Sequence, residues 1–264
     1  MDKATEERLA RSLTAETAEL LPFLPYLLQD FWELGSEPGV MAALAKKHSG
    51  AREGAAVLDL GCGKGAVSVR IAQALKARVK GIDLIPEFVG FAAQKARECG
   101  VADLCHFEIG DICEAAAAEK NYDVVVFGAV GSALGTPAET LRRLKQPAKP
   151  GGLILIDDAC LKEGAAPEGI RFRSGEFLTE KQWAALFEES GLELAEAVWA
   201  SGMESAENPD SASAMAAISK RASELAERLP GKRAIFEGYV RSQQSECDDT
   251  GSILEGVAWA LRKA

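Results

Sequence analysis

Apolar and polar positions between residues 55 and 200 follow two patterns that predict strands and helices in turn. Short, continuously apolar runs are typical of buried strands, and longer stretches with apolar residues three and four positions apart are typical of helices. The short runs predict strands at 55–60, 77–83, 104–111, 122–128, 150–158, 192–200 and 253–263. Helices are expected at 66–76 and 86–99, and after Thr136 and Thr179, which each open a capping-box sequence. Strands that alternate with helices indicate an α/β fold with a largely parallel sheet covered on both faces.

Two regions fall outside this alternation and predict helices that cap the sheet. Residues 1–50 have a helical pattern that Pro22 and Pro25 interrupt. Residues 203–250 begin with the polar stretch 204–213 and continue with two apolar helical faces. The first face consists of Met215, Ile218, Ala222, Leu225 and Leu229, and the second of Ile235, Phe236, Tyr239 and Val240. We therefore expect an N-terminal cap at 1–50, a core at 51–202, a helical insertion at 203–250 and a final strand at 251–264, antiparallel to its partner.

The composition allows a large hydrophobic core and disfavours two classes of partner. Of the 264 residues, 47% are hydrophobic, and the formal net charge is −10. Nucleic-acid-binding proteins normally have a basic face, and anionic membranes attract basic segments, so neither partner is expected. Residues 1–13 are charged and lack the apolar segment of a signal peptide, and no apolar stretch approaches the roughly 18 residues that span a bilayer. We expect a cytoplasmic protein that is a monomer or a homodimer.

The cysteines and histidines do not predict a metal site. The six cysteines include no CxxC pair, and the only histidines are His48 and His106. Cysteines of cytosolic proteins are most often buried and reduced. We expect free thiols, no metal, and a structural role for His106 in its strand.

A glycine-rich turn after the first predicted strand is the main candidate binding site. The sequence LDLGCGKGAV at 58–67 places Gly61, Gly63 and Gly65 where an open parallel sheet binds ligands, outside the carboxyl ends of its strands. Glycines let the backbone approach a ligand, although a tight turn without any ligand would use the same residues. Acidic residues at the ends of the next two predicted strands favour a ligand site over a tight turn without a ligand. Asp83 can accept hydrogen bonds from a ribose diol, and Asp111 can accept one from the amino group of a base.

With their surroundings, these residues resemble the class I S-adenosylmethionine-dependent methyltransferases. The resemblance covers roughly residues 55–200 and the final strand. It is carried by the segments 59–65, 81–83 and 110–112, the fourth-strand block YDVVVFGAVGSAL at 122–134, and LKQPAKPGGLILI at 144–156. The family implies a Rossmann-like, seven-stranded, mostly parallel sheet with an antiparallel last strand. It also implies S-adenosylmethionine as the cofactor.

The same resemblance implies roles for individual residues at the cofactor site. The three glycines would wrap the methionine part, Asp83 would bind the ribose hydroxyls, and Asp111 would face the adenine amino group. The full set of expected cofactor-binding residues is Asp59 (near the methionine amino group), Gly61, Cys62, Gly63, Gly65, Asp83, Leu84, Asp111, Ile112 (beside the adenine), and Phe127 and Gly128 (the floor near the sulfonium).

No catalytic residue can be transferred from the family to this chain. Many members carry an acidic or aromatic-polar signature after the fourth strand, whereas residues 128–132 here are small and nearly neutral. Asp157 and Asp158 at the end of the fifth strand are candidates for a base or a metal site, or for an ordinary acidic strand end. Five aromatic residues of the cap regions are candidates for the walls of an enclosed pocket, or for core positions: Tyr26, Phe31, Trp32, Phe236 and Tyr239.

We therefore expect a methyltransferase that acts on a small molecule by in-line transfer in an enclosed pocket. Methyl transfer from a sulfonium depends mainly on positioning, so the missing catalytic pair does not argue against an enzyme. Two alternatives stay open: an NAD(P)-dependent oxidoreductase, and a non-catalytic sensor that binds S-adenosylmethionine.

Overall fold

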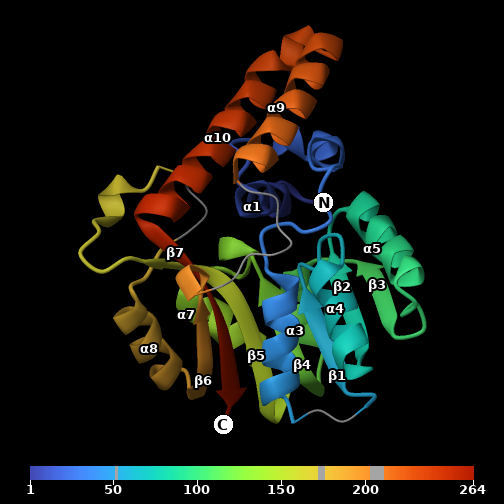
Figure 1. Ribbon diagram of the computed structural model, residues 1–264, viewed down its shortest axis with the longest axis vertical. Coiled ribbons are helices and arrows are strands. Elements are labelled where there is room, and N and C mark those ends of the chain that lie inside the picture. The colour runs from blue at the N-terminus through green and yellow to red at the C-terminus, as the bar shows by residue number, and fades with distance from the viewer. Residues whose placement is uncertain (51–52, 172–175, 203–210) are drawn as a thin grey trace.

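A single seven-stranded sheet forms the centre of the molecule in the computed structural model, which describes residues 1–50, 53–171, 176–202 and 211–264 (Figure 1). The strand order is β3-β2-β1-β4-β5-β7-β6, and the strands from β3 to β5 are parallel. The strands are β1 (Ala56–Leu60), β2 (Arg78–Asp83), β3 (Cys105–Ile109), β4 (Tyr122–Gly128), β5 (Ala148–Leu161), β6 (Leu192–Trp199) and β7 (Leu254–Lys263). The expected α/β class and the mostly parallel sheet are confirmed.

Strand β7 enters the sheet between β5 and β6 and runs antiparallel to both. Leu155 of β5 pairs with Ala260, and Val198 of β6 pairs with Ala258. Residues 257–261 of this strand are all buried. A strand covered on both faces reads as a continuous apolar run, which is why the segment could be recognised from its sequence. The expected antiparallel arrangement of the last two strands is confirmed.

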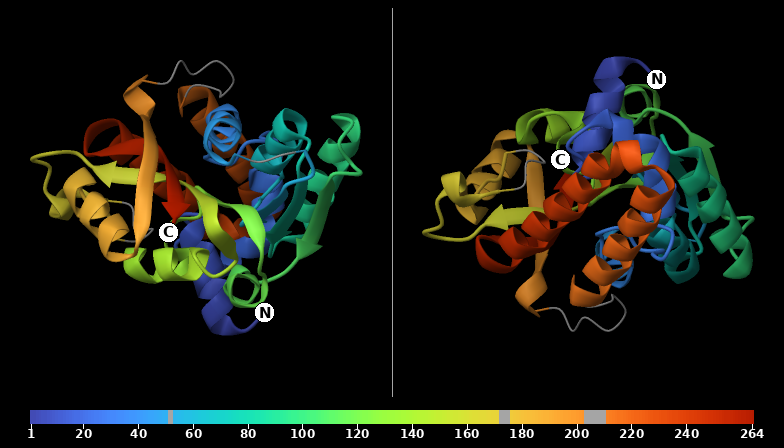
Figure 2. Two further views of the ribbon diagram at one scale, coloured as in Figure 1. Left: turned by 90° about the horizontal axis from the view of Figure 1, so that it is seen from below. Right: turned by 90° about the horizontal axis from the view of Figure 1, so that it is seen from above.

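Helices cover both faces of the sheet, and alternate strand residues point to opposite layers (Figure 2). Val57 and Leu155 pack towards α3, α4 and α5, whereas Leu58 and Ile154 pack towards α6, α7 and α8. The helices of the first layer are α3 (Pro38–His48), α4 (Ala66–Leu75) and α5 (Pro86–Glu98), and those of the second are α6 (Ile112–Ala118), α7 (Pro137–Leu144) and α8 (Glu180–Glu189). Both predicted capping boxes are formed, at Thr136 and at Thr179.

A third group of helices lies beyond the carboxyl ends of β1 and β2. Its hydrophobic cluster includes Leu24, Leu27 and Phe236, together with Ile85 and Phe88, which directly follow β2. Helices α9 and α10 form an antiparallel hairpin that lies beside the N-terminal helices (Figure 1, Figure 2). The elements of this helical cap are α1 (Lys3–Ser12), η1 (Ala18–Phe23), α2 (Leu24–Leu27), α9 (Ser211–Arg228), η5 (Pro230–Lys232) and α10 (Arg233–Ser252).

Residues 1–50 do not form one unit. Met41, Leu44 and Ala45 of α3 pack in the layer with α4, so this helix covers the sheet instead of capping it. The polar stretch 204–213 lies mostly outside the described residues, and α9 begins at Ser211 within it. The predicted domain limits at 51 and 203 also border residues outside the described ranges, so they stay predictions.

Some predicted elements have different bounds. The predicted strand at 104–111 ends at Ile109, and Asp111 instead caps α6, a helix that the sequence did not predict. Strand β5 extends to Leu161, because Cys160 and Leu161 still pair with β7. The remaining short helices are η2 (Gly131–Leu134), η3 (Pro167–Gly169) and η4 (Ala200–Gly202).

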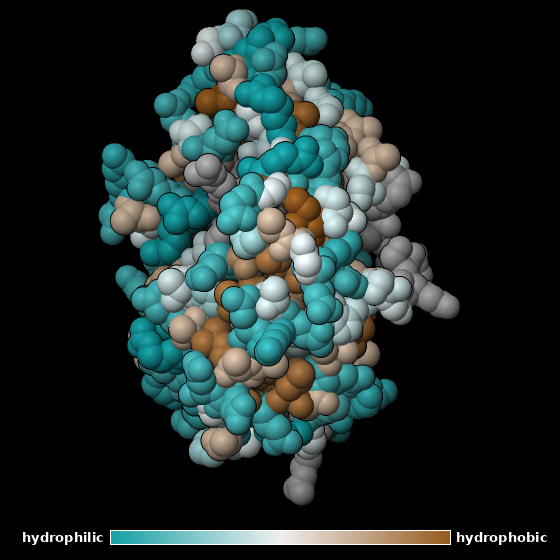
Figure 3. Space-filling model, turned by 90° about the vertical axis from the view of Figure 1, so that its left-hand side faces the viewer, coloured by the Kyte–Doolittle hydropathy of each residue, from teal (hydrophilic) through white to brown (hydrophobic). Residues whose placement is uncertain are grey.

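The surface is mainly hydrophilic on the face in Figure 3, where hydrophobic side chains form separate small groups instead of one broad patch. The exposed large hydrophobic residues of the described chain are Met1, Ile109, Leu194 and Leu229, which are far apart in the sequence. Within the described ranges, no helix has both the length and the apolar character needed to cross a membrane. The cytoplasmic location expected from the sequence stays a prediction.

The aromatic cluster on the α8 side of the sheet should be a main source of stability. Trp259 of β7 is buried and packs against Trp183 and Phe187, with ring centroids 5.0 and 5.6 Å away. Trp259→Ala should lower the free energy of unfolding by about 3–5 kcal/mol, because it leaves a cavity in a packed core. Urea-induced unfolding measures this change. Leu194→Ala, at an exposed position, should change it by less than about 0.5 kcal/mol, and equal effects of the two substitutions would contradict the packing described here.

Candidate active site

The glycine loop after β1 has a conformation that requires glycine at each of the expected positions. Gly61, Gly63 and Gly65 have φ angles of 78°, 50° and 77°. A Cβ atom at Gly61 would lie 2.8 Å from Val130 Cγ2, and one at Gly65 would lie 2.7 Å from Ala92 Cβ. The loop is held against β2, since the Gly61 N–H donates to the Ile82 carbonyl at 2.9 Å. The loop thus lies directly over the carboxyl ends of β1 and β2.

Two adjoining cavities open beside this loop, and they share Leu34, Gly61, Gly63 and Gly128. The first cavity, which we call the β2-side cavity, is also lined by Arg8, Leu9, Ser12, Leu13, Asp83, Leu84, Ile85, Phe88, Ile112, Ala129, Val130 and Ala133. The second, the β1-side cavity, is also lined by Trp32, Ser36, Asp59, Cys62, Lys64, Ala66 and Val67. Together they form one elongated cleft at the carboxyl ends of neighbouring strands, as expected for an open parallel sheet.

Asp83 connects the end of β2 to the glycine loop. Its carboxylate accepts hydrogen bonds from the Gly63 N–H and the Ile85 N–H, both at 2.9 Å, and it lines the β2-side cavity. Burial raises the pKa of the Asp83 carboxyl, although these backbone bonds partly offset the effect. Leu84 and Ile112 line the same cavity, so with Gly61, Gly63 and Gly128 six of the expected residues meet there.

Asp59 lies in the β1-side cavity and points towards α4. Its carboxylate accepts a hydrogen bond from Ser68 Oγ at 2.5 Å, and burial raises its pKa to about 7. Cys62 is buried in the same cavity, and burial raises the pKa of its thiol well above the usual value. A thiol in this state is a packing group and not a nucleophile. All six cysteines of the chain are free thiols.

Asp111 is paired with a residue that the sequence did not connect to this site. Its carboxylate caps α6 by accepting from the Cys113 N–H at 2.8 Å, and it also accepts a charged hydrogen bond from the Arg8 guanidinium of α1. Arg8 lines the β2-side cavity, so α1 closes the end of the cleft that was assigned to adenine. No local sequence signal indicates this pair, because 103 positions separate the two residues.

Not all expected residues meet at the cleft. Gly128 lines both cavities, but Phe127 is buried in the core on the α6–α8 side, because neighbouring strand residues point to opposite faces. For the same reason Asp157 and Asp158 do not form a pair. Asp157 accepts from Ser36 Oγ at 2.8 Å on the α3 side, whereas Asp158 lines a separate cavity beside α8. His106 is exposed on β3 and contacts Glu108.

The described ranges contain no group of three His, Cys, Asp or Glu side chains arranged to hold a metal ion. Of the aromatic candidates, Trp32 lines the β1-side cavity. Phe236 and Tyr239 belong instead to the buried interior of the helical cap, where Tyr26 and Phe31 pack against them. These four residues therefore support the cap and do not line the cleft.

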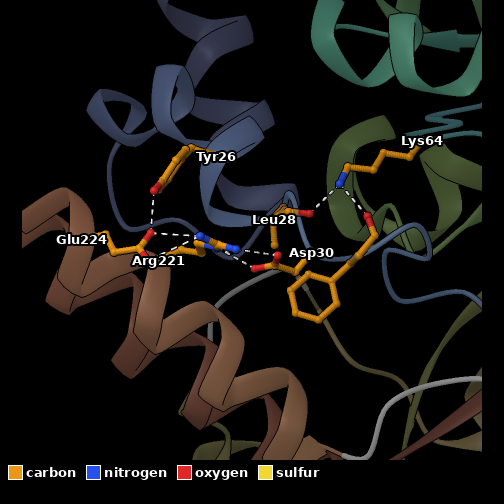
Figure 4. Close-up of polar contacts among 7 residues, drawn as sticks. Tyr26, Leu28, Asp30, Lys64, Arg221 and Glu224 are labelled. Atoms are coloured by element: carbon orange, nitrogen blue, oxygen red, sulfur yellow. Dashed lines mark hydrogen bonds and ion pairs between the residues drawn. The ribbon is translucent and has the colours of Figure 1, made fainter. Parts of the chain in front are cut away.

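Lys64, between two of the loop glycines, attaches the cap to the cleft (Figure 4). Its buried ammonium donates to the Leu28 and Phe31 carbonyls, both at 2.5 Å, and lies 4.9 Å from the centroid of the Phe91 ring. Burial lowers the pKa of Lys64 to about 8. In return, Trp32 Nε1 donates to the Lys64 carbonyl at 3.0 Å.

The same segment of the cap is joined to the helical hairpin by charged hydrogen bonds (Figure 4). Arg221 of α9 binds both carboxylate oxygens of Asp30, at 2.6 and 2.8 Å, and contacts Glu224 at 3.0 Å. Glu224 in turn accepts from the Tyr26 hydroxyl at 2.5 Å. A continuous set of polar contacts thus runs from α9 through residues 26–31 to the glycine loop.

A family model described as a methyltransferase domain matches residues 51–226, which is well over half of the chain. The chain belongs to the methyltransferase-domain family. The family expected from the motifs, that of the S-adenosylmethionine-dependent methyltransferases, is confirmed, and with it the class of cofactor.

Two curated relatives of this methyltransferase show partial matches. It is 30% identical over 147 residues to phosphoethanolamine N-methyltransferase 1 of Triticum aestivum, a match that covers 53% of this chain and 29% of that protein. It is 32% identical over 155 residues to the uncharacterized protein YjhP of Escherichia coli, covering 56% of this chain and 62% of that one. Both matches span less than two thirds of the relative's length.

Solved structures show the same fold over nearly the whole chain. The X-ray structure of Escherichia coli YjhP has a TM-score of 0.71 at 23% identity and covers 91% of this chain and 100% of that one. A Geobacter sulfurreducens S-adenosylmethionine-dependent methyltransferase in complex with S-adenosylhomocysteine has a TM-score of 0.73 at 21% identity, with coverages of 92% and 98%. The predicted class I fold is thereby confirmed.

Replacing Lys64 should loosen the helical cap of the methyltransferase. Lys64→Met keeps the length of the side chain but leaves the Leu28 and Phe31 carbonyls without their donor, which costs about 1–3 kcal/mol for each buried group. We expect lower stability in urea and faster amide hydrogen exchange in residues 24–34. Lys76→Met, at an exposed position, is the matched control. Exchange in this segment that is as slow as in the wild type would contradict the anchoring role.

The buried Asp59 should make the stability of the free protein depend on pH. Its pKa is about 7 in the folded state and 3.8 as the ordinary value, so between these values the folded state binds more protons than the unfolded state. Its contribution to stability is therefore largest below pH 4 and falls as the pH rises to 7. The free energy of unfolding of Asp59→Asn minus that of the wild type should increase from pH 4 to 7, by at most about 1.4 kcal/mol per pH unit, and then level off. A flat difference for Asp59→Asn would refute the assignment.

Proposed function

We propose that this methyltransferase transfers the methyl group of S-adenosylmethionine to a small-molecule acceptor held beneath the helical cap. The observation that carries the proposal is the cleft of two adjoining cavities, which has Asp59 in one part and Asp83 in the other. A zwitterionic amino acid joined to a nucleoside is an elongated ligand with an ammonium at one end and a ribose diol in the middle. A buried carboxylate and a half-buried one, spaced along one cleft, suit both groups.

The residues of the cleft fit the cofactor piece by piece. The bare backbone of Gly61 and Gly63, which line both cavities, and the Asp59 carboxylate suit the methionine end. Asp83 suits the ribose, and the apolar side chains of Leu84 and Ile112 suit the two faces of adenine. Asp111 is the acceptor for the adenine amino group, which would share or replace its contact with Arg8.

The free volume of the cleft indicates that the cap moves when the cofactor enters. The two cavities offer about 70 and 40 Å³, less than a nucleoside needs. Leu34 lines both cavities, and Arg8, Leu9 and Ser12 of α1 line the first. Ala10 is the only buried residue of α1, and Leu9 is half-buried against the cap cluster, so α1 is the part of the cap that we expect to move.

Methyl transfer requires the protein chiefly to position the acceptor and to exclude water. When bound, the cofactor supplies a methyl group on a positively charged sulfur, which is already a good electrophile. Holding the two reactants in line can supply about 7–11 kcal/mol of the barrier. The cap, anchored through Lys64, would shield the reacting atoms from solvent. A small acceptor is favoured by this enclosed position, and the name of the matched phosphoethanolamine N-methyltransferase is consistent with it.

Removing the Asp83 carboxylate should weaken cofactor binding. Asp83→Ala leaves the ribose hydroxyls without a charged acceptor, so the affinity for S-adenosylhomocysteine should fall by about 1.5–3 kcal/mol, or roughly 10- to 150-fold. Isothermal titration calorimetry measures this change, and thermal unfolding reports whether the glycine loop is intact. Glu98→Ala, at an exposed position on α5, should bind like the wild type.

The proposal fails if the wild type does not bind S-adenosylhomocysteine, or if Asp83→Ala folds and binds it unchanged. Catalysis is tested by transfer of radiolabelled methyl groups to phosphoethanolamine and to an extract of small metabolites. Binding without any transfer would instead support the role of a non-catalytic sensor.

A further inference from the structure

Helix α1 forms one wall of the β2-side cavity. Arg8, Leu9 and Ser12 of this helix line it, and Leu13 follows directly after them. Apart from Leu34, the other lining residues come from the ends of β1, β2 and β4 and from the turns and helices that follow these strands. A ligand held at the strand ends therefore has α1 as its immediate neighbour. With α1 in this position the cavity offers about 70 Å³, whereas sites for small molecules commonly have about 300–1,000 Å³.

One charged contact connects α1 to the sheet edge. Among the described residues, the pair formed by Arg8 and Asp111 is the only ion pair or hydrogen bond between Lys3–Ser12 and any residue beyond Ala15. The other polar contacts of the helix, such as that of the Ser12 hydroxyl with the Leu9 carbonyl, lie within its own segment. The polar attachment of α1 to the rest of the chain thus depends on Arg8.

The apolar attachment of α1 is small. The helix packs on η1 and η2, but Ala10 is its only buried residue, and Leu9 is half-buried against the cap cluster. Segments with few buried apolar contacts separate from a fold at low cost in free energy. The ion pair therefore contributes a large part of what holds α1 at the cleft.

The two partners of the ion pair differ in how firmly each is held. Asp111 is the N-cap of α6, and its Oδ1 accepts from the Cys113 N–H at 2.8 Å. Arg8 belongs to the weakly attached helix. The side chains of Arg8 and Asp111 are 28% and 16% exposed, so their attraction is less screened by water than that of a pair on the open surface. Asp111 is a fixed point to which the mobile partner, α1, is tied.

The same carboxylate is the proposed acceptor for the adenine amino group. Its Oδ1 caps α6 and its Oδ2 accepts from the Arg8 guanidinium, so the described chain uses both oxygens. Arg8 also lines the cavity that the nucleoside would fill. The base therefore reaches Asp111 only when the guanidinium has moved.

We propose that the ion pair of Arg8 and Asp111 is a latch that keeps α1 closed over the cleft in the free protein, and that the cofactor opens it by replacing Arg8 at Asp111. The inference rests on the proposed function for the identity of the cofactor. When only the open form binds a ligand, the apparent affinity is reduced by the fraction of molecules that are open. The latch thus makes cofactor binding weaker and slower than the open cleft would allow.

The first test compares Arg8→Met with Arg11→Met, which removes an exposed charge from the same helix. Isothermal titration calorimetry gives the Kd for S-adenosylhomocysteine, and stopped-flow tryptophan fluorescence gives the association rate, since Trp32 lines the β1-side cavity. In Arg8→Met the Kd should fall by about fivefold or more and association should be faster. Arg11→Met should bind like the wild type.

The second test needs no cofactor. Amide hydrogen exchange of residues 3–12 in the free protein should be faster in Arg8→Met than in the wild type. In the Asp111→Asn background, Arg8→Met should add no further increase, because its partner is already lost. Thermal unfolding shows whether each variant is folded.

Three results overturn the latch. Weaker binding of S-adenosylhomocysteine by Arg8→Met shows that Arg8 holds the cofactor. An unchanged Kd shows that α1 does not obstruct the cleft. Exchange in Arg8→Met that is as slow as in the wild type shows that the pair does not hold α1. If neither the wild type nor Arg8→Met binds S-adenosylhomocysteine, the proposed function fails. Faster exchange that requires Asp111 would then still support the ion pair as the attachment of α1.

Discussion

The backbone of the glycine loop has to pass within contact distance of two neighbouring elements, and the carboxyl edge of the sheet is arranged around that approach. A side chain at Gly61 would collide with Val130 after β4, and one at Gly65 would collide with Ala92 of α5. Without side chains the loop lies flat across the ends of β1 and β2, and the Gly63 N–H reaches the Asp83 carboxylate. The turn that closes the sheet edge thereby leaves bare backbone and the carboxylates of Asp59 and Asp83 facing one cleft.

The same loop also holds the helical cap, through a charge that is costly to bury. Taking an ammonium out of water costs several kcal/mol, and two carbonyls with aromatic rings beside them offset part of that cost for Lys64. Because Asp30 of the same segment binds Arg221, the α9–α10 hairpin is connected to the loop as well. A ligand that moves the loop would therefore also move the cap, and a ligand that fixes the cap would favour one loop conformation.

The acids at the strand ends differ in the partners that the described part of the chain provides. Asp59, Asp83 and Asp158 accept only from hydroxyl or backbone donors, and burial raises the pKa of each carboxyl. Asp111, in contrast, has the guanidinium of Arg8. A buried carboxylate without a cation is costly unless a ligand completes its environment, which supports the roles proposed for Asp59 and Asp83 in binding the cofactor.

The sequence by itself determined the sheet and the glycine loop, because both depend on local signals. Continuous apolar runs identified the buried strands, and Gly61, Gly63 and Asp83 could be placed at strand ends from spacing alone. Helix α6 was not predicted, since Ile112–Ala118 is short and has few apolar positions beyond alanine. Only the tertiary structure decided which side of the sheet each side chain faces. It put Phe127 in the core, separated Asp157 from Asp158, and brought Arg8, Lys64 and Trp183 to partners distant in the sequence. Those contacts depend on how helices pack over strand ends, and no periodicity within a single segment encodes that packing.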